Sequence, residues 1–405
     1  MSKNATHGSR RGDITPLPAE PKGLAAREEY VYTLNRRIVN RKNNIFVKLS
    51  MNILYTNFHF AEGGGHTTYI LSLLENKKHT AHVACAESSI LYRKLKERGY
   101  PRLIPIDFYS KPKDLTKIIK NTRRLIRAIE EYDIDIVHTN GSPDNRLALY
   151  ACPFCRKRFK IVFTKHNTIK IHGVISLWRL NKFNDAVIFV SEVAKLDSVG
   201  THANPRYHVI ENGVDLNYWR KQSPMRTGRA IRLISTAGTS PAKGWIHLAE
   251  ALHALPEEQR SRFSSSLLGR PAPAELKSKA QEFCGMEFPG FFTDPRPLLE
   301  EADVGFILSY KEASSFACRE MMAMGLPVIS SDFSNHVRNI DESCGWVTRR
   351  HDAESVRQVL LRILAMPPAE LEAMKLAARR KAERDFSLEK MMAETNAVYE
   401  SLMVN

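Results

Sequence analysis

Short apolar segments alternate with amphipathic ones from Met51 onward. The apolar segments have the length of buried strands, and in the first half of the chain they cover residues 52–56, 134–138, 160–164, 186–190 and 207–210. The stretch after Asp114, a predicted N-cap, instead carries leucine and isoleucine at helical spacing, with basic side chains mostly off that stripe. Such alternation is typical of parallel β-α-β units.

A second series of the same kind begins near residue 230. Its predicted strands cover residues 231–235, 264–268, 303–308 and 327–330, and a helix is expected around residues 248–255. Two consecutive series predict an α/β protein with two doubly wound, Rossmann-like parallel-sheet domains that face a central cleft. Ligands of such folds bind beyond the carboxyl ends of the strands, so the cleft is the expected site.

These patterns divide the chain into four parts. We expect an N-terminal domain over residues 51–218, a C-terminal domain over 219–386, and a last helix over 387–405 that could pack back on the N-terminal domain. Residues 1–50 differ from the rest, with a proline-rich patch followed by a basic stretch. They are expected to be either a disordered basic extension or the product of a start site placed too early.

The composition fits a soluble protein of a reducing compartment. No apolar run approaches the roughly 18–20 residues that a membrane span needs. The amino terminus lacks the apolar stretch of a signal peptide, and six cysteines in 405 residues do not make a disulfide framework. A cytoplasmic location is therefore expected.

The positive charge of the chain is concentrated in its first half. Residues 1–50 carry 10 basic and 4 acidic side chains, residues 51–200 carry 24 and 14, and residues 201–405 carry 26 of each. A one-sided basic surface attracts nucleic acid, an anionic membrane or a phosphorylated acceptor. A surface kept basic for solubility is the plainer alternative.

Two glutamates separated by seven residues form the strongest candidate site. Glu312 follows the predicted strand 303–308, and Glu320 lies about one turn inside a helix that begins near Ser315. The free N–H groups and the positive dipole end of a helix start suit a phosphate, and a carboxylate further in can accept hydrogen bonds from a ribose diol. Solvated acids that flank a core helix are the alternative.

Three further features follow predicted strands. A turn that starts at Gly238 ends at Lys243, a suitable point charge for a diphosphate or, equally, a surface lysine. The first strand is followed by three glycines, Gly63, Gly64 and Gly65. They allow close approach of a ligand, although the G-x-G-x-x-G spacing of a dinucleotide site is absent. His166 stands just past another strand, where site residues of such sheets collect, although a lone histidine is more often structural.

Other candidates carry little weight. Cys152 and Cys155 form a single C-x-x-C pair without nearby histidines, which disfavours a metal or redox role. Walker A and G-x-S-x-G sequences are absent. Residues 175–183 mix apolar and basic side chains, and they fit a membrane-interface segment or, somewhat better, a helix buried in the first domain.

Taken in order, these features resemble the retaining nucleotide-sugar glycosyltransferases of family 4, which have the GT-B fold. The resemblance covers roughly residues 51–400. It is most specific from Glu312 to Ser331, which is similar to the family's E-x7-E segment and to the E-A-M-A-x-G-x-P-V-I that follows it. Further similar stretches are Ile210–Asp215, Val190–Glu192, Asp135–His138, Phe288–Phe291 and Leu298–Asp303.

The resemblance implies a role for each residue of the cleft. Lys243 would bind the diphosphate and neutralise the leaving group, Glu312 would contact the donor sugar, and Glu320 would hold the ribose. His166 would contact the transferring sugar and stabilise positive charge at its anomeric carbon. The other donor contacts implied are Gly64, Gly65, Gly238, Arg270, Phe291 and the backbone N–H groups of Ser315 and Phe316, and the acceptor-side contacts implied are Gly63, His66 and His138.

The chain departs from the family pattern at three places. The arginine that usually precedes the lysine by about five residues is absent, so either Arg270 takes its place or diphosphate binding is weaker. Ala313 and Ser315 stand where glycines are common, and their side chains could clash with a donor or narrow the choice of sugar. Glu211 replaces a proline, a change to which we assign no importance.

The expected function is transfer of a sugar, with retained configuration, from a UDP- or GDP-sugar to an anionic lipid-linked or lipopolysaccharide-type acceptor of the cell envelope. The family needs no bound metal or other cofactor, and the Asp133-x-Asp135 pair precedes a strand and is poorly placed for the cleft. The basic half would hold the protein peripherally at the inner face of the cell membrane, and no nucleic-acid motif accompanies the charge. Two alternatives remain, a nucleotide-sugar epimerase or phosphorylase of similar architecture and a non-catalytic basic binding protein that kept the fold.

Overall fold

The structure is a computed structural model, and it describes residues 37–40, 45–48, 50–59, 65–110, 114–222, 230–333 and 339–404. The chain forms two units, Met1–Ser50 with Met403–Asn405, and Met51–Leu402. In the first unit the described strands β1 (Arg37–Asn40) and β2 (Ile45–Lys48) pair in antiparallel fashion. The second unit contains the two larger sheets.

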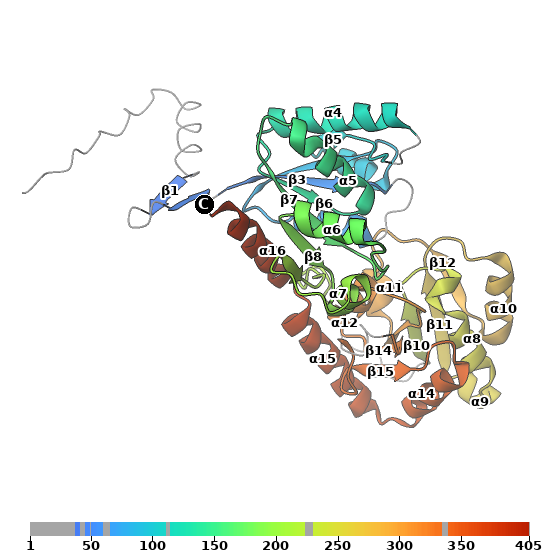
Figure 1. Cartoon of the computed structure of the whole chain (residues 1–405). Helices are drawn as coiled ribbons and strands as arrows, with labels where there is room; N and C mark the ends of the chain where they lie inside the picture. The colour runs from blue at the N-terminus through green and yellow to red at the C-terminus, as the bar shows by residue number, and fades with distance from the viewer. Residues whose placement is uncertain are drawn as a thin grey trace, which may run out of the picture. The chain divides into compact units, whose positions relative to one another are not determined.

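The first domain of the second unit is built on a seven-stranded parallel sheet with the order β5-β4-β3-β6-β7-β8-β9 (Figure 1). Its strands are β3 (Asn52–Asn57), β4 (Thr80–Cys85), β5 (Leu103–Pro105), β6 (Ile136–Thr139), β7 (Lys160–Lys165), β8 (Ala186–Phe189) and β9 (Tyr207–Val209). The helical segments between them are α2 (Gly65–Leu73), α3 (Ile90–Glu97), α4 (Leu115–Glu131), α5 (Ser142–Ala151), η1 (Cys152–Phe154), α6 (Val174–Phe183) and α7 (Glu192–Val199). The order reverses between β3 and β6, and doubly wound sheets bind ligands at such a switch point.

The second domain repeats this design on a six-stranded parallel sheet with the order β12-β11-β10-β13-β14-β15. Its strands are β10 (Ile231–Ser235), β11 (Phe263–Leu268), β12 (Glu287–Gly290), β13 (Val304–Ile307), β14 (Val328–Ser331) and β15 (Gly345–Thr348). Its helical segments are η2 (Pro241–Lys243), α8 (Ile246–His253), α9 (Glu257–Arg260), α10 (Ala274–Cys284), α11 (Arg296–Glu300), α12 (Phe316–Ala323), α14 (Ala353–Ala365) and α15 (Pro368–Asp385). Here the switch point lies between β10 and β13.

Helices cover both sheets, and the central strands β3, β6, β8, β13 and β14 are buried along their whole length. All six residues of β3 are buried. Asp114 accepts a hydrogen bond from the N–H of Lys117 and so caps α4, as predicted. The predicted strands of both series are confirmed with small differences at their ends, whereas β4, β5, β12 and β15 are not among those the apolar pattern identified.

Two chain segments join the domains and touch where they cross. Val214, which follows the first domain, forms an isolated parallel bridge with Ser387. A Cβ on Gly213 would lie 2.4 Å from the carbonyl oxygen of Ser387, so the approach requires glycine. Helix α16 (Leu388–Met403) then runs onto the first sheet, where the Tyr399 hydroxyl lies 2.5 Å from Nδ1 of His138.

Helix α6 packs Leu177 and Leu180 against the first domain but leaves its other large apolar side chains facing outward. Of its ten residues only Leu180 is buried, whereas Val174, Ile175 and Trp178 are each more than half exposed. The interpretation of residues 175–183 as a buried helix is therefore wrong. Within the described ranges, we find no helix with the length and apolar character that crossing a membrane requires.

Candidate active site

The turn after β10 is held against the end of β13 by a glycine. Gly244 has a φ of +63°, and a Cβ there would lie 2.0 Å from the carbonyl oxygen of Leu308. The N–H of Tyr310 donates to the carbonyl of Ala242 over 3.0 Å, which ties the two loops together. The second domain's switch point therefore brings the η2 turn and the loop after β13 side by side, as expected for a ligand site.

Lys243 and Glu312 meet in this place. The ammonium of Lys243, the last residue of η2, forms an ion pair with Oε1 of Glu312. Ser309 donates a second hydrogen bond to the same oxygen over 3.2 Å. Both charged side chains are largely but not fully buried, so the pair lies at the edge of a dry region where charges act strongly. The two residues that the sequence assigns to the diphosphate and the sugar are thus adjacent.

Helix α12 starts beside this pair. The helix begins near Ser315, as predicted: the Ser315 hydroxyl accepts a hydrogen bond from the N–H of Cys318 and forms the N-cap, while Phe316 opens the helix. Glu320 lies one turn further, and burial raises the pKa of its carboxyl to about 7. Among the described residues we find no hydrogen-bond donor or ion-pair partner for this carboxylate. A half-buried carboxylate without a protein donor is suited to accept hydrogen bonds from a ligand.

Two departures from the family pattern have structural uses here. The Ala313 side chain packs against Val190 and Ala194 of the first domain, and its carbonyl accepts a hydrogen bond from Ser191 over 2.8 Å. The Ser315 side chain is occupied in capping α12. The methyl group of Ala313 therefore contributes to the domain junction, which argues against the predicted clash with a donor.

On the first domain, Asn140 organises the histidines of the site. It follows β6, and its amide donates to the carbonyl of Thr56 over 3.0 Å, which turns its Oδ1 toward His166. Nε2 of His166 donates to that oxygen over 2.9 Å, and Nδ1 of His66 donates to the Asn140 carbonyl over 3.1 Å. The rings of His66 and His166 lie 4.4 Å apart between centroids. Asn140 is not among the residues that the sequence analysis selected.

Burial keeps these histidines neutral. It lowers the pKa of His66 to about 3, with a further contribution from His59, and it holds the pKa of His166 well below its ordinary value, with His66 next in weight. The ring of His166 therefore carries its proton on Nε2 and no net charge. A neutral ring adds no repulsion to a positively charged centre nearby.

His138 does not reach the cleft. It is fully buried in β6, where Nδ1 bonds with the Tyr399 hydroxyl and Nε2 lies 2.6 Å from the Thr164 hydroxyl. The prediction that His138 contacts the acceptor is corrected here, because both ring nitrogens are used inside the core.

Gly63 and Gly64 lie outside the described residues, whereas Gly65 lies close to the other domain. A Cβ on Gly65 would be 3.6 Å from the ring of Phe316.

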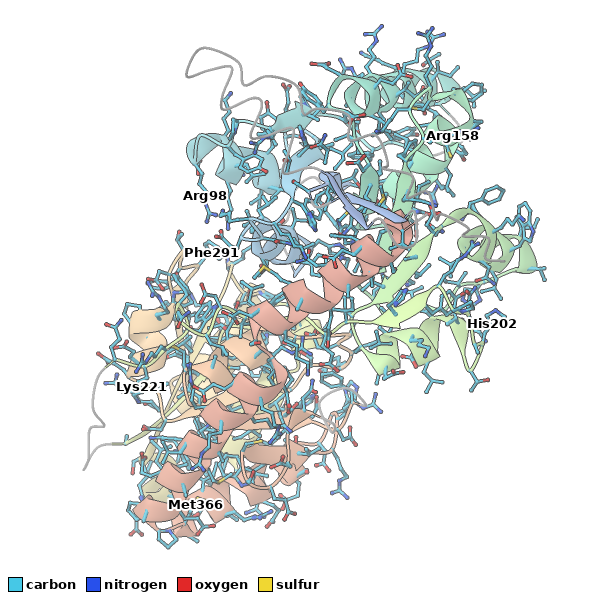
Figure 2. The ribbon with its side chains drawn as sticks, turned by 90° about the vertical axis from the view of Figure 1, so that its left-hand side faces the viewer. Arg98, Arg158, His202, Lys221, Phe291 and Met366 are labelled. Atoms are coloured by element: carbon cyan, nitrogen blue, oxygen red, sulfur yellow. The ribbon has the colours of Figure 1, made fainter. Side chains whose placement is uncertain are left out.

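The three remaining donor residues lie at the rim of the second sheet. Thr239, next to Gly238, donates from its hydroxyl to the carbonyl of Arg270 over 2.7 Å, so Arg270 adjoins the turn whose family arginine is missing. Gly238 itself has a φ of +92°. Phe291 follows β12 with 70% of its surface exposed, and Figure 2 shows it at the surface of the molecule.

The loops at the domain junction approach one another directly. The ammonium of Lys311 donates to the carbonyl of Thr168 over 3.5 Å, and Asn212 donates to the carbonyl of Ser314 over 3.3 Å. The segment that carries Glu312 is therefore in contact with the segment that follows His166. Most of the predicted site residues gather at the carboxyl ends of the two sheets, and His138 is the exception.

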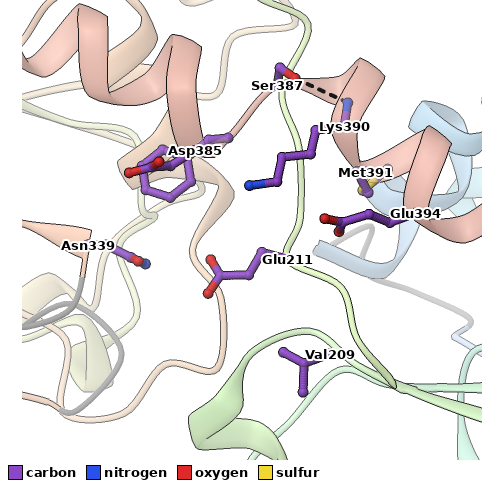
Figure 3. A pocket seen from close by; sticks show the side chains of 9 residues that line it. Val209, Glu211, Asn339, Asp385, Ser387, Lys390, Met391 and Glu394 are labelled. Atoms are coloured by element: carbon purple, nitrogen blue, oxygen red, sulfur yellow. Dashed lines mark hydrogen bonds between the residues drawn. The ribbon is translucent and has the colours of Figure 1, made fainter. Parts of the chain in front are cut away.

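A cavity of about 360 Å³ lies beside the crossing of the two connecting segments. Figure 3 shows the Lys390 side chain extending into it from α16, with Glu211 below. Glu211 also forms an ion pair with Arg319, a residue of α12 that is 1% exposed. The sequence analysis assigned no importance to Glu211, whereas the structure gives it a buried partner.

A metal site is not apparent in the described part of the chain, where no three histidine, cysteine or acidic side chains are grouped to hold an ion. Asp135 accepts from the N–H of Asn52 over 2.8 Å, and Lys157 pairs with Asp133 and Asp135. Both aspartates therefore lie at the amino ends of the strands, away from the cleft. Cys152 and Cys155 are free thiols.

Comparison with solved structures identifies the architecture. A glycosyltransferase from Rickettsia africae ESF-5 superposes with a TM-score of 0.74 at 20% identity, over 87% of this chain and 99% of that chain. Anabaena Alr3699/HepE in complex with UDP also gives 0.74, at 17% identity, over 87% of this chain and 100% of that chain. The chain has the GT-B fold.

Sequence comparisons agree with the GT-B fold. The chain matches the description Glycosyltransferase Family 4 over residues 63–218 and Glycosyl transferases group 1 over residues 231–366. The amylovoran biosynthesis glycosyltransferase AmsK of Erwinia amylovora is 28% identical over 225 residues, which are 52% of this chain and 54% of that relative. The match spans about half the length of AmsK. Together these matches support a glycosyltransferase of the GT-B fold.

Proposed function

We propose that this GT-B protein is a retaining glycosyltransferase that moves a sugar from a UDP- or GDP-sugar to an anionic, lipid-linked acceptor of the cell envelope. The observation that carries the proposal is the Lys243–Glu312 pair beside the start of α12, with the unpartnered carboxylate of Glu320 inside that helix. A cation, free N–H groups and a carboxylate match a diphosphate and a ribose. Anabaena Alr3699/HepE, which has a similar fold, binds UDP-glucose in one of its structures, and this supports the donor class.

In the proposed reaction the second domain holds the donor. The ammonium of Lys243 and the N–H groups at the start of α12 bind the diphosphate, whose negative charge grows as the glycosidic bond breaks. Fixed positive groups in a partly buried site stabilise that charge without reorganisation. Glu312 is then released from Lys243 toward the hydroxyls of the sugar, and Glu320 accepts from the ribose.

The first domain would hold the acceptor and face the anomeric carbon. The acceptor hydroxyl attacks this carbon from the side of the leaving group, the bond to the diphosphate oxygen breaks, and that oxygen takes the hydroxyl proton. Configuration is retained because entry and departure occur on one face. His166, neutral and oriented by Asn140, lies on this side of the site and can face the developing positive charge without repelling it.

The acceptor class rests on charge and on one relative. The excess of basic side chains lies in the first 200 residues, which include the first domain. AmsK carries the name of an amylovoran biosynthesis glycosyltransferase, which supports a role in building a cell-surface glycan. An anionic acceptor would be attracted to this half of the protein.

The donor part of the proposal is tested by thermal shift against UDP, GDP, ADP, CMP and their sugar conjugates, with and without a metal chelator. Saturation at a hundred times the dissociation constant stabilises by about 2.7 kcal/mol, which shifts the midpoint measurably. We expect one base to stabilise the protein equally with and without chelator, and less in Glu320→Ala. Product configuration is then read by NMR. Absence of any nucleotide effect, with binding to anionic vesicles intact, would instead favour a non-catalytic binding protein.

A further inference from the structure

A cationic cavity lies under helix α6. It has a volume of about 280 Å³, and its lining includes Arg146, Lys165, Lys170 and Arg179 but no carboxylate of the described residues. Of these four cations Lys165 is buried, Arg146 and Arg179 are partly buried and Lys170 is exposed. Like charges gathered around one cavity repel one another unless an anion or water compensates them. The composition of the lining therefore points to an anionic ligand.

The two inner cations are held in place by neutral groups. Arg146 donates from Nε and Nη2 to the Ser110 hydroxyl over 3.2 and 2.9 Å. Lys165, 7% exposed, donates to the carbonyls of Asn167 and Ile169 and to the Asn167 side chain. Burial lowers the pKa of Lys165 to about 8, with repulsion from Lys311 next. The ion pairs of the described residues include neither Arg146 nor Lys165, and the Asp144 carboxylate acts on Arg146 only without direct contact.

The outer cations belong to α6 or precede it, next to an exposed apolar surface. Lys170 and Arg179 also form no ion pair within the described part of the chain. The apolar surface consists of Ile169, Val174, Ile175, Trp178 and Phe183, which are 63, 85, 78, 55 and 46% exposed. Residues 174, 175 and 178 share one face of the helix. The cavity lined by Lys170 and Arg179 therefore adjoins a large exposed apolar surface at α6. Figure 1 shows the place of this helix in the first domain.

This combination matches an amphiphile with a phosphate headgroup. We propose that α6 and the cavity beneath it form the docking site for the phosphate or diphosphate of a lipid embedded in a bilayer. The phosphate enters the cavity between Lys170 and Arg179, while Ile175 and Trp178 insert at the membrane interface, where tryptophan is favoured. The inference rests on the proposed function and deepens it, because it makes the acceptor a phosphate-linked lipid.

The site is suitably placed for that role. The cavity includes Lys165 and Asn167, the two neighbours of His166 in the sequence, and it therefore lies beside the proposed sugar site at the same end of the sheet. A lipid phosphate bound there would bring the attached acceptor hydroxyl near the cleft. Helix α4 also exposes basic side chains, Arg123 and Arg127 among them, but the large apolar side chains that it exposes are only Leu115 and Ile119.

The experiment measures binding by sedimentation with vesicles of phosphatidylcholine alone or mixed with phosphatidylglycerol. In the same samples it measures the fluorescence emission of Trp178. The Lys170→Ala/Arg179→Ala variant should bind the mixed vesicles about thirtyfold more weakly, since each basic side chain near an anionic surface contributes roughly fivefold. Arg123→Ala/Arg127→Ala removes the same charge from α4 and should retain most of the binding. The emission of the wild type should shift to the blue on the mixed vesicles, and Trp178→Phe should lose that shift.

Several outcomes would overturn the inference. Equal losses in the α6 and α4 variants would mean attraction by net charge alone. Binding of inorganic pyrophosphate in the cavity without vesicle binding would indicate a soluble phosphate ester as the ligand. A dimer in solution that Trp178→Ser dissociates would assign the apolar face to a second copy. The thermal shift with nucleotides is unaffected by the α6 variants if they fold, so failure here is distinguished from failure of the proposed donor site.

Discussion

The guanidinium of Arg319 donates a hydrogen bond to the carboxylate of Glu211, across the junction between the two domains. Its Nη1 also donates to the carbonyl of Asn212 and to the Ser314 hydroxyl, each over 2.6 Å. The guanidinium lies 4.8 Å from the ring of Phe386. Arg319 of α12 therefore fixes both segments that connect the domains, because Asn212 belongs to one and Phe386 to the other.

Removal of one partner should destabilise this junction. In Glu211→Gln the buried guanidinium keeps a neutral acceptor but loses its counter-charge. Breaking a buried pair costs about 3–5 kcal/mol, and we expect less here, about 1–3 kcal/mol, because Glu211 is 35% exposed. The midpoint of urea denaturation measures the change. Glu192→Gln, which removes an exposed partner of Lys195, is the control and should cost less than about 1 kcal/mol.

Lys243→Ala should lower kcat/KM by about a hundredfold to a thousandfold, as loss of one fixed group that stabilises transition-state charge commonly does. The fold should be unaffected, since Lys243 belongs to a surface turn whose close contact is made by Gly244. Steady-state kinetics with the donor found by thermal shift measures the effect. Lys279→Ala, which removes a partner of Glu250 far from the turn in sequence, is the matched control. Unchanged turnover in Lys243→Ala would remove this lysine from the mechanism.

Donor binding should weaken as the pH falls through about 7, because burial raises the pKa of Glu320 to that value. The ionised carboxylate accepts from ribose hydroxyls, and protonation converts one oxygen to a donor. The stability of the ligand-free protein depends on pH in the opposite direction. The folded state binds this proton more tightly than the unfolded state, so this contribution to stability is present at low pH and is lost as the pH rises from about 4.5 toward 7.

Isothermal titration with an intact nucleotide sugar at several pH values measures this dependence, since its phosphates are diesters and do not titrate near neutrality. In Glu320→Gln the dependence should disappear and binding should be weak throughout. A wild-type dissociation constant that stays level between pH 6 and pH 8 would contradict the assignment of the ribose to Glu320.

The sequence predicted the features that local patterns determine, namely where helices begin and which residues follow strands. Asp114 is a recognisable N-cap because capping depends on residues three positions apart, and it is confirmed, as is the start of a helix near Ser315. Glu312 and Lys243 follow strands of a doubly wound sheet, and chain direction alone brings such loops to one edge. The ion pair between them joins loops 69 residues apart, but the topology makes that meeting foreseeable.

The rest depended on contacts between distant segments. The last helix was expected to be able to pack back on the first domain, but His138 and Tyr399 are 261 residues apart, and no local signal indicates that these two side chains meet. Glu211 and Arg319 are likewise 108 residues apart, so a replaced proline could be judged only after the partner was known. The outward face of α6 was ambiguous for another reason. A helix with apolar residues can bury that face or expose it, and periodicity does not distinguish the two.

Asn140 offers the clearest test of how the first domain contributes. Its Oδ1 accepts from Nε2 of His166 and its carbonyl accepts from Nδ1 of His66, so one residue sets the orientation of both rings. In Asn140→Ala the His166 ring loses its fixed acceptor and can rotate. We expect kcat to fall by up to about a hundredfold, as small misplacements near reacting atoms can cause, with little change in nucleotide affinity, because the donor site belongs to the other domain.

Asn140→Asp separates orientation from electrostatics. The carboxylate still accepts from His166, but its charge should raise the pKa of the ring, so a protonated His166 would appear as a new limb on the acid side of the pH profile of kcat. The matched control is Asn76→Asp, which changes an amide that bonds Lys78 and Asn396 in the turn after α2. If Asn140→Ala lowers nucleotide affinity and leaves kcat unchanged, the orienting role is wrong and Asn140 only stabilises the loop after β6.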